Sequence, residues 1–515
     1  RQRQMCIRDR LVYIVSWLFA LAVSFVSCDD WLDKTPKDRL YPDVYFKTED
    51  ELRLFTNQFY NNLVPSAVDI YSESSDLIVK SDLMLEMSGQ RIIPDEGNGW
   101  NFTALRDINF YLQYSHNCTE VNARNRYDGV ARFFRAYFYF EKVKRYGDIP
   151  WYDKALDSDD PELYKARDSR EFVMQKMLED LDFAIANLPK TKNAYVLTRW
   201  TALALKSRVC LFEGTFRKYH GLEDYEKYLN ACVSASETFM NESGYTLYKS
   251  GSTPYRDLFA SINLQADEVI FGRDYEASLS VLHNVQNYEN STTMGRPGMN
   301  KKIVNSYLMA DGSRFTDKAG YETMTFDQEC QNRDPRLAQT IRTPGYTRIG
   351  STKKEAPNLA YTMTGYHLIK YSMTANYDEY NKSCNDIPLF RTAEVYLNFA
   401  EAKAELGTLK QADINKSIKL LRDRVGMTNL DMELANSKPD PYLMSAATGY
   451  PNVKGANQGV ILEIRRERTI ELAMEGFRYY DIMRWKEGKL FENDLLGIYA
   501  VSYTHLRAHE TGAYL

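Results

Sequence analysis

The sequence predicts a mainly α-helical fold, in which a tetratricopeptide-like helical repeat scaffold carries long irregular loop insertions. Three observations support this prediction. Apolar residues recur at threes and fours in several stretches, small and large residues alternate in one helix pair, and aperiodic segments rich in Tyr, Gly, Asn and Thr separate the stretches. No linker rich in Pro, Gly or Ser divides the chain, so we expect a single domain over residues 28–500.

The first strongly periodic stretch is GVARFFRAYFYFEKVKRY, residues 129–146. Its helix should end at the Gly-Asp-Ile-Pro of 147–150, because glycine and proline terminate helices. Two adjacent faces of this helix are aromatic, one with Phe133, Tyr137 and Phe140 and the other with Phe134 and Phe138. So wide an apolar belt implies neighbours on several sides.

Further periodic stretches predict helices at about 170–187, 197–213 and 225–240. The clearest helix pair begins with RTAEVYLNFAEAKAEL, residues 391–406, and continues after Gly407 to about Val425. Small and large residues alternate in its first helix, as they do where tetratricopeptide helices approach closely, although strict self-similarity at a period of about 34 residues is absent.

Two long segments, 41–115 and 242–390, are expected to be chiefly irregular. They wrap the helical scaffold in this prediction. Loops carried by a rigid scaffold are where binding residues usually lie, so we look for a binding site in these segments first.

The C-terminal stretch EIRRERTIELAMEGFRYYDIMRW, residues 463–485, packs charged side chains among apolar ones at helical spacing. One apolar face should be buried, and Gly476 should interrupt the helix. Arg468 and Glu471, and likewise Arg478 and Asp481, are three residues apart, which places opposite charges side by side on a helix. Acids so close to many arginines favour a structural ion-pair network over acid–base catalysis.

The N-terminal region has the pattern of an export signal. Residues 11–27 contain no charge, follow two arginines and precede Cys28. This apolar run is shorter than the ~20 residues of a membrane-spanning helix. We therefore expect residues 1–27 to be a signal peptide and Cys28 to become an acylated N-terminus. Residues 1–10 and 501–515 lack the patterning of their neighbours, so we expect both to be non-native and the native C-terminal end to be missing.

Composition excludes several classes of function. The formal net charge is −5 and no basic stripe is visible, which argues against nucleic-acid binding. No cofactor or metal site is expected, since His505 and His509 stand in the doubtful tail. Five cysteines after Cys28 make no CxxC pair and are expected to be buried thiols: Cys118, Cys210, Cys232, Cys330 and Cys384.

The segment IRRERTIELAMEGFRYYDIMRW, beginning at Ile464, resembles the C-terminal signature of the SusD/RagB family, the lipid-anchored nutrient-binding proteins of Bacteroidetes outer membranes. Four other segments occur in the order of that family, namely the start at Cys28, RFFRAYFYFEKVKRYGDIP from Arg132, RDPRL from Arg333 and RTAEVYLNFAEAKAELG from Arg391. We interpret Asp334-Pro335-Arg336 as a structural turn.

The resemblance implies a SusD-like, tetratricopeptide-like lipoprotein held on the outer surface of the outer membrane. It implies a protein that captures an oligosaccharide or polysaccharide without catalysis and delivers it to a SusC-like TonB-dependent transporter. Which glycan is bound does not follow from the resemblance.

Aromatic residues in polar, aperiodic surroundings are the candidates for sugar binding, because exposed rings stack on sugars and amides bind sugar hydroxyls. Trp100 in GNGWN leads, and similar family members place a ligand-stacking tryptophan in a comparable early loop. The ligand-binding candidates are Trp100, Asn98, Asn101, Tyr71, Tyr275 and Tyr288. A loop tryptophan that merely anchors local packing is the alternative.

Two other functions remain open at this point. A tetratricopeptide-like scaffold also binds peptide segments of other proteins. A glycoside hydrolase is less favoured, because the sequence offers no nucleophile elbow, phosphate loop or histidine–carboxylate cluster. One exposed aromatic patch away from the helix grooves would favour a small-ligand site over a peptide site.

Overall fold

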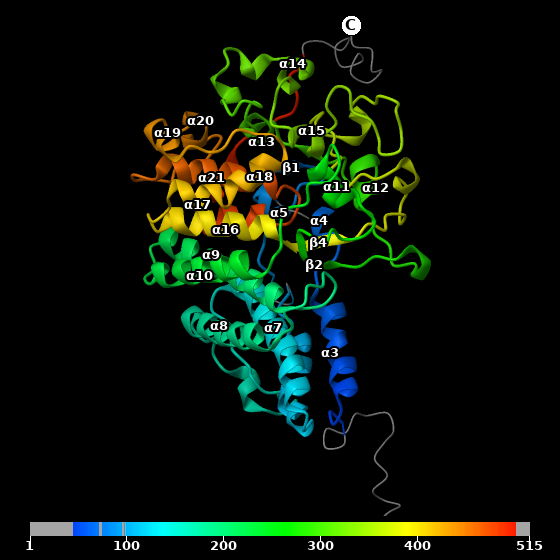
Figure 1. Cartoon of the computed structure of the whole chain (residues 1–515), viewed down its shortest axis with the longest axis vertical. Coiled ribbons are helices and arrows are strands. Elements are labelled where there is room, and N and C mark those ends of the chain that lie inside the picture. The colour runs from blue at the N-terminus through cyan, green and yellow to red at the C-terminus, as the bar shows by residue number, and fades with distance from the viewer. Residues whose placement is uncertain (1–44, 72–74, 95–96, 98, 501–515) are drawn as a thin grey trace, which may run out of the picture.

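A computed structural model describes residues 45–71, 75–94, 97 and 99–500 (Figure 1). The predicted signal peptide, Cys28, Asn98 and residues 501–515 lie outside these residues. The described helices are α3 (Glu49–Leu63), α4 (Val68–Tyr71), α5 (Leu85–Ser88), α6 (Thr103–Tyr114), α7 (Val121–Tyr146), α8 (Arg170–Asn187), α9 (Arg199–His220), α10 (Tyr225–Glu242), α11 (Pro254–Ala260), α12 (Val285–Asn290), α13 (Lys301–Ser306), α14 (Phe326–Cys330), α15 (Leu337–Thr340), α16 (Thr392–Glu405), α17 (Gln411–Asn415), α18 (Ile418–Arg424), α19 (Met432–Ser437), α20 (Pro441–Met444), α21 (Gln458–Glu471) and α22 (Arg478–Arg484). The strands are β1 (Ile78–Val79), β2 (Val269–Arg273), β3 (Gly298–Met299) and β4 (Ile387–Arg391).

The long helices form one continuous stack, visible in Figure 1. Helix α7 packs on α8, α8 on α9, α9 on α10, α10 on α16 and α16 on α21. Gly214 of α9 lets α10 approach closely, because a Cβ added there would lie 2.7 Å from side-chain atoms of Leu229. The predicted mainly α fold is confirmed. Across the described residues, no helix combines the length and apolarity needed to cross a bilayer.

Helix α7 begins at Val121, eight residues before the predicted start. Its extra N-terminal turns expose several polar residues, so the hydrophobic pattern missed them, although Tyr127 in that part is buried. The predicted end is correct: α7 stops at Tyr146 and Gly147 follows with φ 71°. All five predicted aromatic residues are buried in one large apolar cluster, which accounts for the wide apolar belt.

The segment 41–115 is more helical than expected, since it contains α3 and α6. Helix α3 has a capping box between Thr48 and Glu51 and buries Leu52, Thr56 and Phe59 at helical spacing. The buried threonine interrupts the apolar period, and its hydroxyl donates to the carbonyl of Leu52 at 2.9 Å. The prediction of an irregular segment was wrong here because a polar residue occupies the core face.

The segment 242–390 is largely irregular, as predicted. Strand β2 pairs antiparallel with β4, with Val269 opposite Arg391, so the long irregular stretch between these two strands starts and ends at one small sheet just before α16. Between these strands no described α-helix exceeds six residues. The second two-stranded sheet pairs β1 with β3, which ties the early loop to the insertion.

Two predicted helices are interrupted. After Gly407, whose φ is 74°, the chain forms α17 and α18 separately, and Ser417 between them has φ −134° and ψ −90°. The C-terminal helix α21 ends at Glu471, five residues before the predicted break at Gly476. The early end is stabilised from outside the helix, because Lys370 donates to the carbonyl of Ala473 at 2.5 Å.

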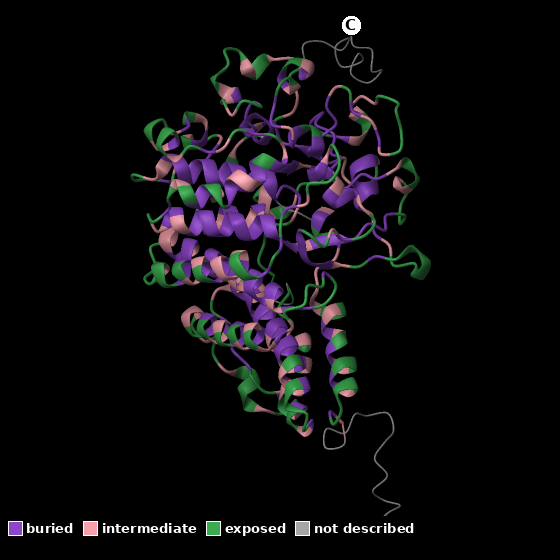
Figure 2. Ribbon diagram, in the orientation of Figure 1, coloured by how far each residue is buried: buried purple, intermediate pink, exposed green. Residues whose placement is uncertain are grey.

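The charged side of α21 is buried together with its apolar side, and every residue from Gly459 to Glu471 is buried (Figure 2). Glu471 forms ion pairs with Arg336 at 3.1 Å, Arg391 at 2.7 Å and Arg424 at 2.5 Å. Burial alone would raise the pKa of Glu471, but these three guanidiniums outweigh it and hold that pKa well below its usual range. The predicted structural ion-pair network therefore exists.

Its pairings differ from the predicted ones. Arg468 pairs with Asp481 at 2.8 Å rather than with Glu471, and Arg478 pairs with Asp76 at 2.7 Å rather than with Asp481. Three-residue spacing describes neighbours on an exposed helix, whereas these buried arginines find carboxylates across the core. Sequence spacing therefore predicted the network but not its partners.

The Asp334-Pro335-Arg336 segment is a turn, as predicted. The amide of Leu337 donates to the carbonyl of Asp334 at 2.9 Å, and the Arg336 side chain pairs with the Asp334 carboxylate at 2.7 Å. The five predicted cysteines are free thiols, all buried except the half-buried Cys330. Burial raises the pKa of the Cys232 thiol to about 12, which makes it unreactive.

Candidate functional site

The loop that carries Trp100 borders a pocket of about 600 Å³, within the size range of small-ligand sites. Its walls come from the loop before α6, from α6 itself and from the connection between α7 and α8. The lining residues are Trp100, Phe102, Thr103, Leu105, Arg106, Asn109, Pro150, Tyr152, Lys154, Leu156, Leu163, Tyr164, Lys165, Ala166 and Arg167. We call it the Trp100 pocket.

Local interactions hold the Trp100 loop against α7. Lys142 of α7 donates to the carbonyl of Gly99, and the indole packs edge-on against Tyr146 with ring centroids 4.9 Å apart. The side-chain oxygen of Asn101 accepts from the amide of Thr103 at 2.8 Å, in a local turn one residue before Phe102, the N-cap of α6. Asn101 therefore shapes the entry to α6, and its predicted contact with a sugar stays a proposal.

Two aromatic side chains of the Trp100 pocket remain accessible. Trp100 is 39% exposed, with the guanidinium of Arg167 lying 4.9 Å from its ring centroid. Tyr164 is 89% exposed. Tyr152 is buried in the wall, where its hydroxyl donates to the carbonyl of Glu162 at 3.1 Å. The pocket thus offers one partly covered indole and one free phenol ring.

Among the residues that the structure describes, the polar lining of the Trp100 pocket is basic or neutral. Its charged members are four cations, with no Asp or Glu among the described residues: Arg106, Lys154, Lys165 and Arg167. Lys154 pairs with Glu162 at 2.9 Å and Lys165 with Asp168 at 3.0 Å, both acids outside the lining. Neither Arg106 nor Arg167 forms an ion pair with a carboxylate of the described residues. Nε of Arg106 donates only to the carbonyl of Leu156, at 3.3 Å.

The predicted tyrosines lie elsewhere, in a second apolar cluster. Tyr71 and Tyr288 have ring centroids 5.9 Å apart, and Tyr275 belongs to the same cluster. Tyr275 is 7% exposed and Tyr288 is 2% exposed, so neither ring is open for stacking on a sugar. Tyr71 is half-buried at the edge of this cluster. Burial removes Tyr275 and Tyr288 from the proposed binding surface.

The predicted residues therefore do not form one patch. Trp100 contacts Phe102, Tyr146 and Arg167, none of which belongs to the tyrosine cluster. Asn98, the remaining candidate, lies outside the described residues. A single exposed aromatic patch, which would have favoured a small-ligand site over a peptide site, is therefore not formed by these residues.

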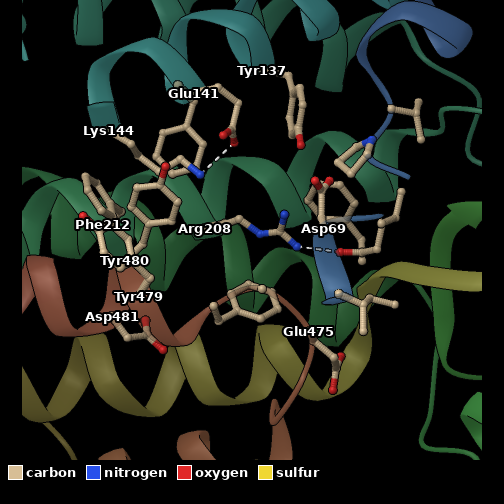
Figure 3. Close-up of a pocket in the computed structure, with 18 of the residues that line it drawn as sticks. Asp69, Tyr137, Glu141, Lys144, Arg208, Phe212, Glu475, Tyr479, Tyr480 and Asp481 are labelled. Atoms are coloured by element: carbon tan, nitrogen blue, oxygen red, sulfur yellow. Dashed lines mark hydrogen bonds and ion pairs between the residues drawn. The ribbon is translucent and has the colours of Figure 1, made fainter. Parts of the chain in front are cut away.

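A larger cleft of about 750 Å³ lies between α7, the connection of α3 to α4, and the turn that precedes α22 (Figure 3). Glu141 and Lys144 of α7 form an ion pair of 2.7 Å in it. Arg208 binds the carboxylate of Glu394 with two hydrogen bonds, of 2.6 and 2.7 Å. Burial raises the pKa of Asp69 at one wall, and the Glu141 carboxylate raises it further.

Most carboxylates of this cleft are committed to the fold. Glu475 pairs with Arg391 and with Lys370, each at 2.7 Å, and Asp481 pairs with Arg468. Carboxylates held in short ion pairs with buried cations serve packing rather than proton transfer. The cleft therefore offers aromatic walls but few free acids.

Sequence reasoning missed Tyr164 and Arg167. Tyr164 stands in PELYKAR, a polar and aperiodic stretch, so the criterion that selected Tyr71 applied to it as well. For Arg167 the sequence holds no signal, because its role depends on the tertiary contact with Trp100.

Comparison with known proteins identifies the family. A model of the SusD family matches residues 258–507, and a model described as starch-binding associating with outer membrane matches residues 90–199. The chain is 26% identical over 497 residues to SusD-like protein P2 of Formosa agariphila, which covers 91% of this chain and 90% of that protein. It is 23% identical over 502 residues to SusD-like protein P38 of the same organism, covering 89% and 88%.

Solved structures share the fold. A SusD-like protein of Bacteroides fragilis superposes with a TM-score of 0.68 at 23% identity, covering 88% of this chain and 89% of that one. A SusD-like carbohydrate binding protein of the same species gives 0.67 at 19% identity, covering 89% and 91%. The chain has the SusD-like helical architecture, and together these matches show that it belongs to the SusD/RagB family. The family predicted from the C-terminal signature is confirmed.

Proposed function

We propose that this protein is a non-catalytic lipoprotein of the outer-membrane surface that captures an oligosaccharide in the Trp100 pocket and delivers it to a SusC-like TonB-dependent transporter. The observation that carries the proposal is the Trp100 pocket itself. It places the accessible rings of Trp100 and Tyr164 beside several hydrogen-bond donors, the combination that sugar recognition needs. The carbohydrate-binding description of one solved relative supports the same ligand class.

The described lining supports capture without cleavage. Hydrolysis of a glycosidic bond usually requires two carboxyl groups that flank it, about 5 to 9.5 Å apart. Among the described residues no Asp or Glu lines the Trp100 pocket, so the described lining supplies no acid–base pair to a sugar bound there. The larger cleft, where Asp69 has a raised pKa beside Glu141, is the alternative place for a hydrolase site.

Calorimetric titration with plant, host and microbial polysaccharides tests the capture site. We expect at least one glycan to bind, and Trp100→Ala and Tyr164→Ala each to weaken binding about fivefold to tenfold, because ring stacking typically contributes about 1 to 1.5 kcal/mol. Tyr380→Ala, which removes an exposed ring outside the Trp100 pocket, is the matched control and should bind like the parent.

The same titrations separate the competing functions. Release of shorter products from a labelled glycan, lost in Asp69→Asn, would contradict the non-catalytic proposal. Failure of the folded protein to bind any glycan would favour a scaffold that binds peptides. Burial is the largest cause of the raised pKa of Tyr71, and Tyr380 lies close enough to Tyr71 to contribute to it. Weakening by Tyr380→Ala but not by Trp100→Ala would therefore move the site to the tyrosine cluster around Tyr71.

Anchoring and delivery need experiments in cells. Cys28→Ala should release the protein from the membrane fraction and abolish incorporation of labelled palmitate, if Cys28 carries the lipid. Loss of the whole protein should lower uptake of the labelled oligosaccharide while the transporter remains in the outer membrane. Unchanged uptake would contradict delivery and leave capture intact.

A further inference from the structure

We propose that the Trp100 pocket selects an acidic glycan, whose carboxylate or sulfate groups are bound by Arg167 and Arg106. This inference rests on the proposed glycan capture and adds the chemical class of the ligand. It is supported by the contacts of the described lining side chains. Among them, free hydrogen-bond donors with positive charge outnumber free acceptors.

Arg167 is placed to bind an anion. Its guanidinium lies on the Trp100 ring, 4.9 Å from the centroid, and no carboxylate of the described residues pairs with it. A guanidinium stacked on an aromatic ring keeps its N–H groups pointing outward in its own plane, where two of them match a carboxylate or a sulfate. The contact with Trp100 thus places a cation at the pocket wall.

Arg106 supplies a second cation from α6. Only its Nε is engaged, by the carbonyl of Leu156 at 3.3 Å, so the two terminal nitrogens form no hydrogen bond with the described residues. Lys154 and Lys165 add charge to the same wall, although acids behind the lining pair with both. Two unpaired cations and two paired ones therefore face the ligand, and no carboxylate of the described lining residues opposes them.

Acceptors for sugar hydroxyls are scarce among the lining side chains. The amide nitrogen of Asn109 donates to the carbonyl of Tyr152 at 2.8 Å, and its amide oxygen accepts from Arg135 at 3.3 Å. The Tyr152 hydroxyl is occupied by the Glu162 carbonyl. A neutral sugar brings many donors and needs such acceptors, whereas an acidic sugar brings its own acceptors to the free guanidiniums.

The basic lining is a local feature of an acidic chain. The formal net charge is −5, and the buried arginines of the C-terminal network are matched by carboxylates. Unpaired cations in the Trp100 pocket are therefore not a reflection of overall composition.

The test compares matched pairs of ligands by calorimetry. One pair is an oligogalacturonide and its carboxyl-reduced, neutral form, and the other is a sulfated galactan oligosaccharide and its desulfated form. We expect at least one acidic form to bind about tenfold to a hundredfold more tightly than its neutral partner, with affinity that falls as salt rises. Which pair responds distinguishes a carboxylate from a sulfate ligand.

Variants place the effect in the Trp100 pocket. Arg167→Gln should weaken the acidic form about tenfold and leave the neutral form unchanged, and Arg106→Gln, which leaves the Trp100 stack in place, should act in the same direction. Lys249→Gln removes the same charge from an exposed position outside the pocket and is the control. Circular dichroism establishes that each variant is folded.

The possible outcomes distinguish failure of the proposed selection for acidic glycans from failure of the proposed glycan capture. Equal binding of acidic and neutral forms would overturn the selection of acidic glycans and leave glycan capture standing. A loss in Lys249→Gln as large as in Arg167→Gln would also overturn it, because the effect would then come from the overall charge. Binding of none of these ligands or of the wider panel would overturn capture itself.

Discussion

Arg336 and Arg167 are the same side chain in opposite surroundings. Arg336 is 1% exposed and contacts the carboxylates of Asp334, Glu467 and Glu471. Arg167 is exposed, lies on the Trp100 indole and pairs with no carboxylate of the described residues. A buried charge needs partners because its desolvation costs several kcal/mol, whereas an exposed one does not. The partners of Arg336 are therefore required by folding, and the free guanidinium of Arg167 is available for a ligand.

The largest expected effect is in the buried network. Glu471→Gln removes the negative charge shared by Arg336, Arg391 and Arg424, so we expect the free energy of unfolding to fall by about 3–5 kcal/mol. Denaturant unfolding followed by circular dichroism measures it. Asp423→Asn, which breaks an exposed pair with Lys419, is the control and should cost less than about 0.5 kcal/mol. Equal losses in both variants would contradict the contrast between buried and exposed charges.

Acid should weaken a second set of buried ion pairs, around Glu401. Burial alone would raise the pKa of Glu401, but Arg484, Arg468 and Arg465 outweigh it and lower that pKa from 4.5 to about 2. A carboxyl whose pKa is lower in the folded state stabilises the fold above pH 4.5, and this contribution of about 3 kcal/mol is lost as the pH falls toward 2. Glu401→Gln should flatten the dependence of unfolding free energy on pH in this window. An unchanged slope would contradict the assignment.

The smallest effect on stability is expected in the Trp100 pocket. Arg167→Gln removes an exposed cation with no ion pair, so the free energy of unfolding should change by less than about 0.5 kcal/mol. Thermal and denaturant unfolding of the variant measure this change. A loss above about 1.5 kcal/mol would mean that Arg167 serves the fold like Arg336, and the contrast between the two regions would fail.

Much of the helical scaffold was predictable from the sequence because its helices bury apolar residues at regular spacing. Helices α8 and α16 lie within one residue of their predicted bounds. Helix α3 was missed because Thr56 occupies its core face, and the pairing of Arg478 with Asp76 was missed because 402 residues separate them. Periodicity reports burial of apolar residues and carries no information on which distant charges meet.

The candidate site was less predictable. Trp100 does line a pocket, but Tyr288 is buried although polar residues surround it in the sequence. Those neighbours are themselves buried and hydrogen-bonded: the Gln286 side chain donates to the carbonyl of Thr374 at 2.7 Å, and Ser372 donates to the Glu289 carboxylate at 2.6 Å. The polar neighbours of Tyr288 in the sequence predicted that its ring would be exposed to solvent. In the fold these neighbours are buried and form their hydrogen bonds within the protein.

Hydrogen exchange with and without bound oligosaccharide tests the placement of the ligand most directly. With the tightest-binding glycan of the panel, we expect slower exchange in residues 99–106 and 150–167 and no change in α21. Protection confined to the larger cleft, at 137–145 and 475–481, or to the tyrosine cluster around Tyr71, would contradict a binding site in the Trp100 pocket.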